Sequence, residues 1–210
     1  MGSTKSSEKT RERLVEAAGR LFAEKGFNGV TVRDIVQKAE THLSALNYHF
    51  RSKEALYREA LLTACAKASF SPKNREELLQ LEPYEALYTI INESLKWHDQ
   101  RPAKNWENDI IVRECWEPSC VFGEVVEKYF KPQVSFMAEI IGKIAGKPPD
   151  DPKVLYAVIV LIGLVDTFGE YRLLIDSVAP NLTSHFKQGN LLTKELFNTM
   201  VQTVKTSIDE

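Results

Sequence analysis

Hydrophobic side chains recur along this chain every three or four positions, which is the spacing of an amphipathic helix. In a first segment over about residues 9–25, Leu14, Leu21 and Phe22 share one helical face. Gly26 follows at the point where a residue in left-handed conformation commonly ends a helix. We find no convincing alternation of hydrophobic and polar residues that would indicate a strand. The pattern therefore predicts an all-α fold.

Three further segments are expected before the chain reaches Ser71-Pro72. Residues 32–39 form a short helix, and Thr31 suits its N-terminal cap because Asp34 stands three positions later, close to a capping box. Residues 43–49 form a second short helix. A longer helix begins after Ser52, which we expect to cap its N-terminus. Connections of three to four residues predict that these short helices pack as one small body.

Longer helices are expected beyond this point, separated by breaks that mostly contain proline. The expected ranges are 82–100, 106–116, 122–129, 132–145, 152–177 and 192–208. Residues 154–165 are apolar on every face, which implies burial on all sides. In a chain of 210 residues, a second copy would have to supply part of that cover. We therefore expect a homodimer through the last two long helices, with a central core helix of a monomer as the alternative.

The two short helices at 32–39 and 43–49 have the size of a helix-turn-helix. The apolar positions expected to face the core are Val32, Ile35, Val36, Ala39, Leu46 and Phe50. The side chains left outside are short or able to form hydrogen bonds, namely Thr41, His42, Ser44, Ala45, Asn47, Tyr48 and His49. Such side chains suit base edges and phosphate oxygens, whereas an ordinary exposed helix usually carries Glu and Lys. This pattern favours a DNA-recognition helix.

Lys53 gives an independent indication, since it stands in the first turn of the following helix. The helix dipole disfavours a cation there by about 0.3–1 kcal/mol. A bound phosphate would reverse that penalty, because helix N-termini attract anions. A tolerated surface lysine beside Glu54 is the alternative interpretation.

Composition adds a charge asymmetry to this picture. Residues 1–67 hold 12 Lys and Arg against 8 Asp and Glu, a net charge of +4, although the whole chain is at −2. A basic first third suggests a polyanionic partner for that part alone. The longest apolar run is shorter than the roughly 18–20 residues that a membrane span needs, and the first residues lack the apolar stretch of a secretory signal. We expect a soluble, cytoplasmic protein that does not bind membranes.

The amino-terminal blocks resemble the DNA-binding domain of tetracycline-repressor (TetR) type regulators over residues 10–62. The blocks are Thr10-Arg11-Glu12-Arg13-Leu14, Leu21-Phe22-Ala23-Glu24-Lys25-Gly26-Phe27, Thr31-Val32-Arg33-Asp34-Ile35, Asn47-Tyr48-His49-Phe50 and Ser52-Lys53-Glu54-Ala55-Leu56. A looser similarity to one branch of the family runs through 125–134 and 148–152.

The resemblance implies an all-helical homodimer with a helix-turn-helix domain at 1–67 and an effector-binding and dimerisation domain at 68–210. It implies that Thr31, Arg33, Tyr48, His49 and Lys53 contact the DNA backbone. It implies further that Thr41, His42, Ser44 and Ala45 face bases, with Asn47 near base or phosphate. The chain departs from the family at Glu40, where glycine is usual, and at Thr41 and His42. If Glu40 keeps the left-handed conformation, its side chain costs on the order of 1 kcal/mol and its carboxylate repels phosphate.

The second domain should hold the pocket for a small-molecule effector. Seven residues there are candidates for contacting the ligand: Trp97, Trp106, Arg113, Trp116, Phe136, Phe168 and Arg172. Packing in the core is the alternative at each of these positions.

No histidine or cysteine spacing fits a metal site, and no glycine-rich phosphate loop is present, so we expect no cofactor and no enzyme. The sequence predicts a ligand-responsive homodimeric repressor of a palindromic operator. The alternatives are an activator on the same scaffold, a helical ligand-binding module with weak DNA binding, and a small all-α enzyme.

Overall fold

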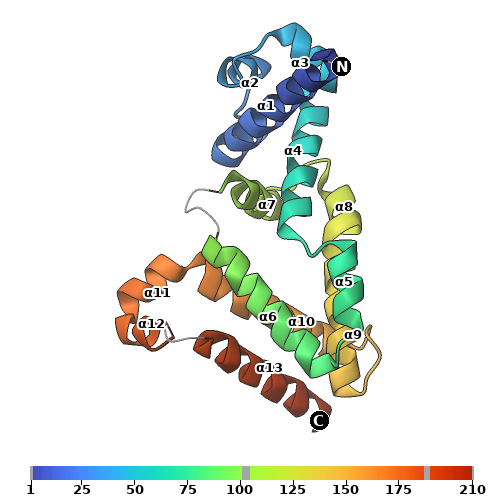
Figure 1. The fold of residues 1–210 in the computed structure, drawn as a ribbon, viewed down its shortest axis with the longest axis vertical. Coiled ribbons are helices and arrows are strands. Elements are labelled where there is room, and N and C mark those ends of the chain that lie inside the picture. The colour runs from blue at the N-terminus through green and yellow to red at the C-terminus, as the bar shows by residue number, and fades with distance from the viewer. Residues whose placement is uncertain (1, 101–104, 187–189, 210) are drawn as a thin grey trace. The chain divides into compact units, whose positions relative to one another are not determined.

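The computed structural model describes residues 2–100, 105–186 and 190–209, and within these ranges all regular structure is helical. The chain divides into two compact units (Figure 1). Unit 1 comprises residues 1–70 and 103–131, and unit 2 comprises residues 71–102 and 132–210. The all-α fold predicted from the sequence is confirmed.

Unit 1 contains six helices and one π-helical turn within its described residues. They are α1 (Gly2–Lys25), α2 (Val32–Lys38), α3 (Leu43–Phe50), α4 (Lys53–Ala68), α7 (Trp106–Trp116), α8 (Phe122–Val125) and the π-turn η1 (Val126–Phe130). The helices α1, α4 and α7 pack on one another around a core that includes Phe22 and Tyr57, whose rings meet edge to face at 4.9 Å. Cys65 is buried in the same core. The short helices α2 and α3 rest on α1, so this core fixes their orientation.

Unit 2 is built on a second set of packed helices. They are α5 (Pro72–Leu79), α6 (Pro83–Gln100), α9 (Lys131–Ala145, in this unit from its second residue), α10 (Pro152–Glu170), α11 (Arg172–Val178), α12 (Pro180–Phe186) and α13 (Leu191–Asp209). The helices α6, α10 and α13 pack on one another in a three-helix core. Ile91, Leu161 and Met200 are among the side chains that they bury.

Two helices were not expected from the sequence, and both begin at a proline. Ser71 accepts a hydrogen bond from the backbone N–H of Asn74, and Pro72 is the first residue of α5. Pro180 likewise opens α12. A proline ends the preceding helix, but its fixed φ also suits the first position of the next one.

Pro132 was also expected to start a new helix, and here the helical path is continuous from α8 through η1 into α9. Lys131, the residue before the proline, keeps helical dihedral angles of φ −58° and ψ −48°. The π-helical turn Val126–Phe130 widens the backbone where the ring of Pro132 would meet the carbonyl group of the preceding turn. The π-turn therefore accounts for a proline inside a continuous helix.

The expected long helix over 152–177 is interrupted at Tyr171, where α10 ends and α11 begins. The segment 154–165 was expected to be buried on every side, but in the single chain it is not. Val154, Leu161 and other residues of one face are buried, whereas Tyr156 and Ile159 are 62% and 61% exposed. The single chain therefore covers only one face of α10.

By length and apolar composition, α10 is the one helix among the described residues that passes a test for crossing a membrane. The core helix of a soluble protein has the same length and apolar composition.

The division of the structure differs from the predicted domain boundary at residue 67. The helices α7 and α8 and the turn η1 cluster with the amino-terminal helices, because α7 packs against both α1 and α4. The division into a DNA-binding part and an effector part remains a prediction about function.

Candidate nucleic-acid interface

The first helix of the predicted helix-turn-helix begins with a complete capping box. The hydroxyl group of Thr31 accepts a hydrogen bond from the backbone N–H of Asp34 at 3.2 Å, and the carboxylate of Asp34 accepts from the backbone N–H of Thr31 at 2.9 Å. The Thr31 hydroxyl also donates to this carboxylate, and these bonds lower the pKa of Asp34 below its ordinary value. The cap predicted from the sequence is confirmed. It fixes the start of α2, where Thr31 and Arg33 are exposed.

The turn after α2 keeps the left-handed conformation that usually requires glycine. Glu40 has a φ of +48°. Two hydrogen bonds hold the turn: the N–H of Glu40 donates to the carbonyl oxygen of Gln37 at 3.1 Å, and the N–H of Thr41 donates to that of Val36 at 3.0 Å. This is the Schellman pattern that ends many helices. The strain expected at Glu40 is therefore present in the structure.

Arg13 on α1 ties this turn to the core of unit 1. Its guanidinium group donates to the carbonyl oxygens of Ala39 and Glu40, the latter at 2.7 Å, and lies 3.9 Å from the Glu40 carboxylate. Main-chain carbonyl groups at the end of a helix need such donors. Arg13 therefore holds the main chain of the turn between α2 and α3 through hydrogen bonds that do not depend on the side chain at position 40.

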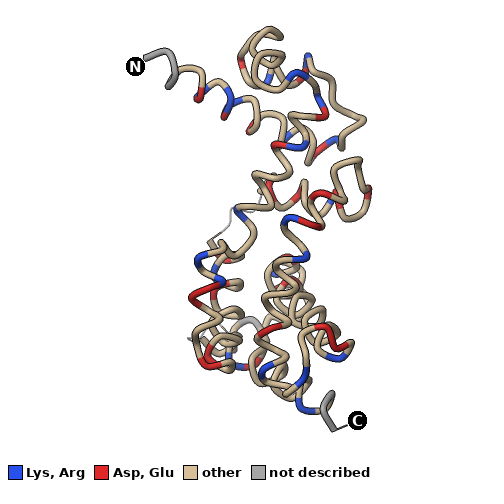
Figure 2. The backbone as a smooth tube through the Cα atoms, turned by 90° about the vertical axis from the view of Figure 1, so that its right-hand side faces the viewer, with Lys and Arg blue, Asp and Glu red and all other residues tan. Residues whose placement is uncertain are grey.

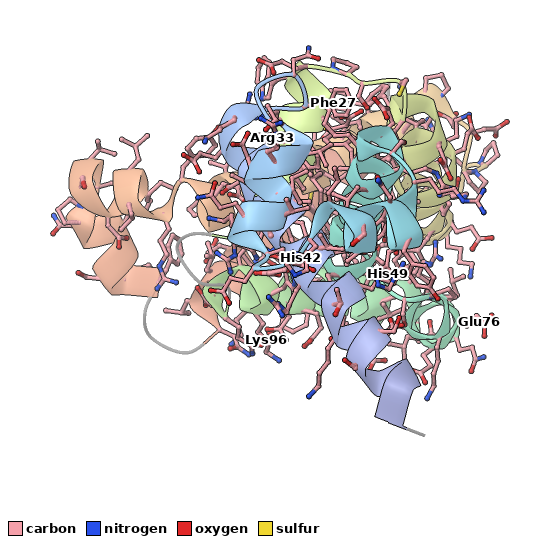
Figure 3. The ribbon with its side chains drawn as sticks, turned by 90° about the horizontal axis from the view of Figure 1, so that it is seen from above. Phe27, Arg33, His42, His49, Glu76 and Lys96 are labelled. Atoms are coloured by element: carbon pink, nitrogen blue, oxygen red, sulfur yellow. The ribbon has the colours of Figure 1, made fainter. Side chains whose placement is uncertain are left out.

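The helix α3 presents a polar face to solvent while its apolar side is buried. Leu46 and Phe50 are buried in the core of unit 1. The outward residues include His42, Ser44 and Asn47, and Tyr48 is 78% exposed. Residues 41–50 contain no acidic side chain. In Figure 3, the labelled histidines 42 and 49 lie near each other, whereas Arg33 on α2 lies nearer to Phe27.

Ala45, Thr41 and His49 are partly buried, so only part of each side chain is available. Ser44, Ala45, Tyr48 and His49 line a shallow hollow together with Ser6, Ser7 and Thr10 from the first turns of α1. The recognition helix thus lies beside hydroxyl groups from α1 that the sequence alone did not place there.

Lys53 at the start of α4 is engaged within the protein. Its ammonium group donates to the carbonyl oxygens of Phe27 and Val30 at 3.0 and 3.1 Å and lies 4.2 Å from the centre of the Phe27 ring. These contacts hold the loop between α1 and α2, where Phe27 is labelled in Figure 3. Ser52 caps α4 by accepting from the N–H of Ala55, as expected. Sequence reasoning assigned Lys53 to phosphate and missed this internal role.

Arg51 was not singled out from the sequence, although it stands between α3 and α4. It is exposed and has a φ of +64°, a conformation that few side chains adopt. Figure 2 shows basic residues recurring along the helices that follow the N-terminus, with acidic residues between them. An arginine held in this position adds a cation next to the exposed face of α3.

Three of the residues predicted to contact the ligand, Trp106, Arg113 and Trp116, lie in unit 1. The first two contact α1, and the third is exposed to solvent. The ring of Trp106 is packed so closely on α1 that a Cβ atom at Gly19 would lie 2.1 Å from it. Arg113 donates to the carbonyl oxygens of Ala23 and Glu24, which closes the C-terminal end of α1. Trp116 is 82% exposed. The structure does not bring these residues to a common cavity.

The other four candidates, Trp97, Phe136, Phe168 and Arg172, lie in unit 2. Phe168 and Arg172 line a cavity of about 290 Å³ among α6, α10, α11, α12 and the start of α13, whereas Trp97 and Phe136 are not among its lining residues. Phe136 is buried in α9. His98 from α6 lines this cavity too.

An exposed polar helix on a helix-turn-helix, carried by an all-α scaffold with a second helical unit, defines a DNA-binding transcriptional regulator. The model of the family "Bacterial regulatory proteins, tetR family" matches residues 14–60, and that of the "HTH-type transcriptional dual regulator CecR, C-terminal domain" matches residues 83–185. The chain belongs to the TetR family of transcriptional regulators.

Relatives of known name fall in the same class. The chain is 42% identical over 125 residues to the uncharacterised HTH-type regulator YerO of Bacillus subtilis, which covers 57% of this chain and 40% of YerO. It is 27% identical over 180 residues to the dual regulator CecR of Shigella flexneri, covering 79% and 78%. A match to the probable regulator YttP of Bacillus subtilis is 32% identical and covers 34% and 40%. The alignments thus span less than half the length of YttP and YerO.

Solved structures share the fold at low identity. A linker-substituted mutant of the regulator HlyIIR has a TM-score of 0.65 at 21% identity, covering 90% of this chain and 96% of the other. NalD, the secondary repressor of the MexAB-OprM multidrug efflux pump in Pseudomonas aeruginosa, has a TM-score of 0.62 at 19% identity, covering 95% and 97%.

Proposed function

We propose that this regulator is a homodimeric repressor that binds a palindromic operator through α3 and releases it when a small molecule occupies unit 2. The observation that carries this proposal is the outward face of α3, where hydrogen-bonding side chains are exposed and no carboxylate is present between residues 41 and 50. Major-groove recognition requires such a face.

The roles of individual residues follow from their positions along the helix-turn-helix. We assign Thr31, Arg33, Tyr48, His49 and Lys53 to the DNA backbone. We assign Thr41, His42, Ser44 and Ala45 to base edges, with Asn47 within reach of either. The exposure of Thr31, Arg33 and Tyr48 supports the backbone contacts. The ammonium group of Lys53 donates two hydrogen bonds to the loop before α2. Its third N–H group is available to a phosphate.

Dimerisation is supported by the apolar face that α10 leaves uncovered. Leu155, Tyr156 and Ile159 lie along this face and are exposed in the single chain. Contiguous apolar surface of this kind marks an interaction site in soluble proteins. A two-fold pairing of the last helices covers it and places two copies of α3 at one fixed separation. Successive major grooves on one side of DNA are about 34–36 Å apart, which is the separation that the dimer has to match.

Regulation then requires only that the ligand prefers one of two dimer conformers. A ligand that binds better to the conformer with another spacing lowers DNA affinity by its differential affinity for the two. Transcriptional activation at some promoters is a second candidate, favoured by the name "dual regulator" that the relative CecR carries.

The test combines oligomeric mass with DNA affinity in one protein preparation. Light scattering at micromolar concentration should give a dimer, and Ile159→Asp should give a monomer because it places a carboxylate in the apolar interface. Wild-type protein should bind random-sequence duplex DNA with an affinity that falls steeply as salt rises, and Ile159→Asp should bind it more weakly. A monomeric wild type, or no binding in dilute buffer, contradicts the proposal. Val112→Asp, at an exposed apolar position on α7, is the matched control and should leave the mass unchanged.

A further inference from the structure

The cavity of unit 2 contains two buried polar atoms that lack a hydrogen-bond partner. They are Nδ1 of His98 and Oδ1 of Asp176, and both residues line the cavity. Buried polar atoms in proteins are almost always paired, so each unpaired one needs an explanation. Two in one cavity indicate a place where a ligand supplies the missing partners.

The imidazole of His98 is held in position by its surroundings. Its side chain is 7% exposed, and the ring lies so close to α10 that a Cβ atom at Gly169 would be 2.3 Å from it. Asp166 and Glu170 on α10 approach its two ring nitrogens at 3.6 and 3.4 Å. The second of these approaches leaves Nδ1 without a hydrogen bond of acceptable geometry.

Among the described residues that line the cavity, two cations, Lys96 and Arg172, match two carboxylates, Asp99 and Asp176, in number. The two cations that line it are already engaged, because Lys96 pairs with Glu93 at 2.9 Å and Arg172 pairs with Asp99. No ion pair is found for Asp176 within the described part of the chain, and its Oδ1 atom is sealed from solvent. A buried carboxylate oxygen without a donor favours a cationic partner.

The remainder of the lining combines apolar side chains with the neutral polar side chains of Asn92, Asn190 and Thr193. Phe168, Leu182 and Phe186 form part of it, and the volume of about 290 Å³ is at the small end of the range for ligand sites. An apolar body with a single charged head fits this division of the surface. Aromatic rings of the lining also suit a cation at their faces.

We propose that this cavity binds a small organic cation, a protonated amine or amidinium on an apolar body, whose N–H groups donate to Asp176 and to His98. The proposal deepens the proposed function, because it rests on unit 2 being the sensor and names the chemical class of its effector. An anionic ligand is repelled by the carboxylate of Asp176, and a neutral donor gives it a weaker hydrogen bond than a cation does.

Three probes with one phenyl body and different heads test the chemistry. Calorimetric titration of the full-length protein should detect phenethylamine, weaker or no binding of the neutral phenethyl alcohol, and none of the anion hydrocinnamate. Asp176→Asn preserves the shape and removes the charge, so it should weaken phenethylamine binding about tenfold or more. Asp150→Asn, an exposed carboxylate in the turn before α10, is the matched control and should bind as wild type does. Hydrocinnamate binding as tightly as phenethylamine, or no loss in Asp176→Asn, overturns the proposal.

A measurement on unaltered protein covers the case in which Asp176→Asn does not fold. Nitrogen NMR of the histidine rings should show the Nδ1 signal of His98 shifting on addition of phenethylamine, while the signals of His42 and His49 stay in place. The absence of any such shift at saturating probe overturns the site. DNA affinity is measured separately with the same probe. If phenethylamine binds but the affinity for DNA is unchanged, the cation site is supported and its role as sensor is refuted. If the protein does not bind DNA even without the probe, only the proposed function is refuted.

Discussion

Two replacements of Glu40 separate the effect of its backbone conformation from the effect of its charge. Its main chain holds a left-handed conformation at φ +48°, and its exposed carboxylate stands at the turn leading into α3. Glu40→Gly removes both the backbone strain and the charge. Glu40→Gln removes the charge alone, because it keeps the Cβ atom and hence the strain. Arg13 still donates to the carbonyl oxygens at positions 39 and 40 in both variants, so the turn should keep its shape.

The expected sizes follow from simple estimates. A side chain in the left-handed region costs about 1–2 kcal/mol, and the extra freedom of glycine in the unfolded chain returns about 0.5–1 kcal/mol of this. Glu40→Gly should therefore raise the free energy of unfolding by about 0–1.5 kcal/mol, whereas Glu40→Gln should leave it within about 0.5 kcal/mol. The ion pair with Arg13 is long and exposed, so its loss contributes little.

Removal of the Glu40 charge should change the affinity for DNA. A carboxylate about 10 Å from a phosphate in water is repelled by about 0.4 kcal/mol, and two phosphates at that distance give about 0.8 kcal/mol. Both variants should then bind DNA about two to four times more tightly, and the gain should shrink at high salt. Fluorescence anisotropy on one labelled duplex at two salt concentrations measures the affinity, and urea titration measures the stability. Unchanged affinity in both variants would show that the carboxylate points away from phosphate.

The remaining predictions address the residues that support the interface. Lys53→Ala should weaken binding to specific and non-specific DNA alike and lower the free energy of unfolding by about 1–2 kcal/mol, since it removes two hydrogen bonds and a ring contact; a loss confined to one base pair would contradict the phosphate role. Tyr57→Phe should cost about 1–3 kcal/mol in urea unfolding, because the buried carboxylate of Glu114 loses a hydrogen-bond donor; a wild-type midpoint would show that the bond contributes nothing. The guanidinium of Arg58, together with the ammonium of Lys128, lowers the pKa of Glu124 to about 2, so this carboxylate stabilises unit 1 at neutral pH, and the stabilisation is lost as the pH falls from about 4.5 towards 2. Glu124→Gln should therefore be less stable than wild type at pH 7, with a deficit that disappears at the acid end; a pH-independent deficit would be the contrary result.

The sequence was sufficient where one local signal has one structural meaning. Thr31 and Ser52 were predicted as helix caps, and both accept the expected hydrogen bonds. Gly26 was expected in the left-handed region and has a φ of +70°. The buried face of α3 was also predicted, because Leu46 and Phe50 are the apolar residues at helical spacing.

The sequence was insufficient where one feature, such as a proline or a lysine, fits two structural roles. A proline at 72 or 180 ends a helix and suits the start of the next, and only packing decides whether that next helix forms. The basic residue at position 53 was interpreted through the helix dipole, whereas the structure shows its ammonium bound to carbonyl oxygens of a loop 23 and 26 residues earlier. Such long-range partners have no signature in a single sequence.

The ligand cavity shows the same limit. Aromatic and basic residues were the only guide to it, and of the seven candidates only Phe168 and Arg172 line the cavity. Trp106 and Arg113 are likewise aromatic and basic, but they hold α7 against α1. The chemistry proposed for this cavity depends on His98 and Asp176, which stand out only because a buried atom of each lacks a hydrogen-bond partner.

Selection of binding sites from a pool of random duplexes tests the central claim most directly. The account predicts that duplexes retained by the full-length protein share an inverted repeat, with half-site centres about one helical turn apart, and that Asn47→Ala changes the preferred half-site without abolishing retention. Retained duplexes with no common sequence, or with a single unrepeated site, would contradict the idea that α3 reads DNA as part of a two-fold dimer.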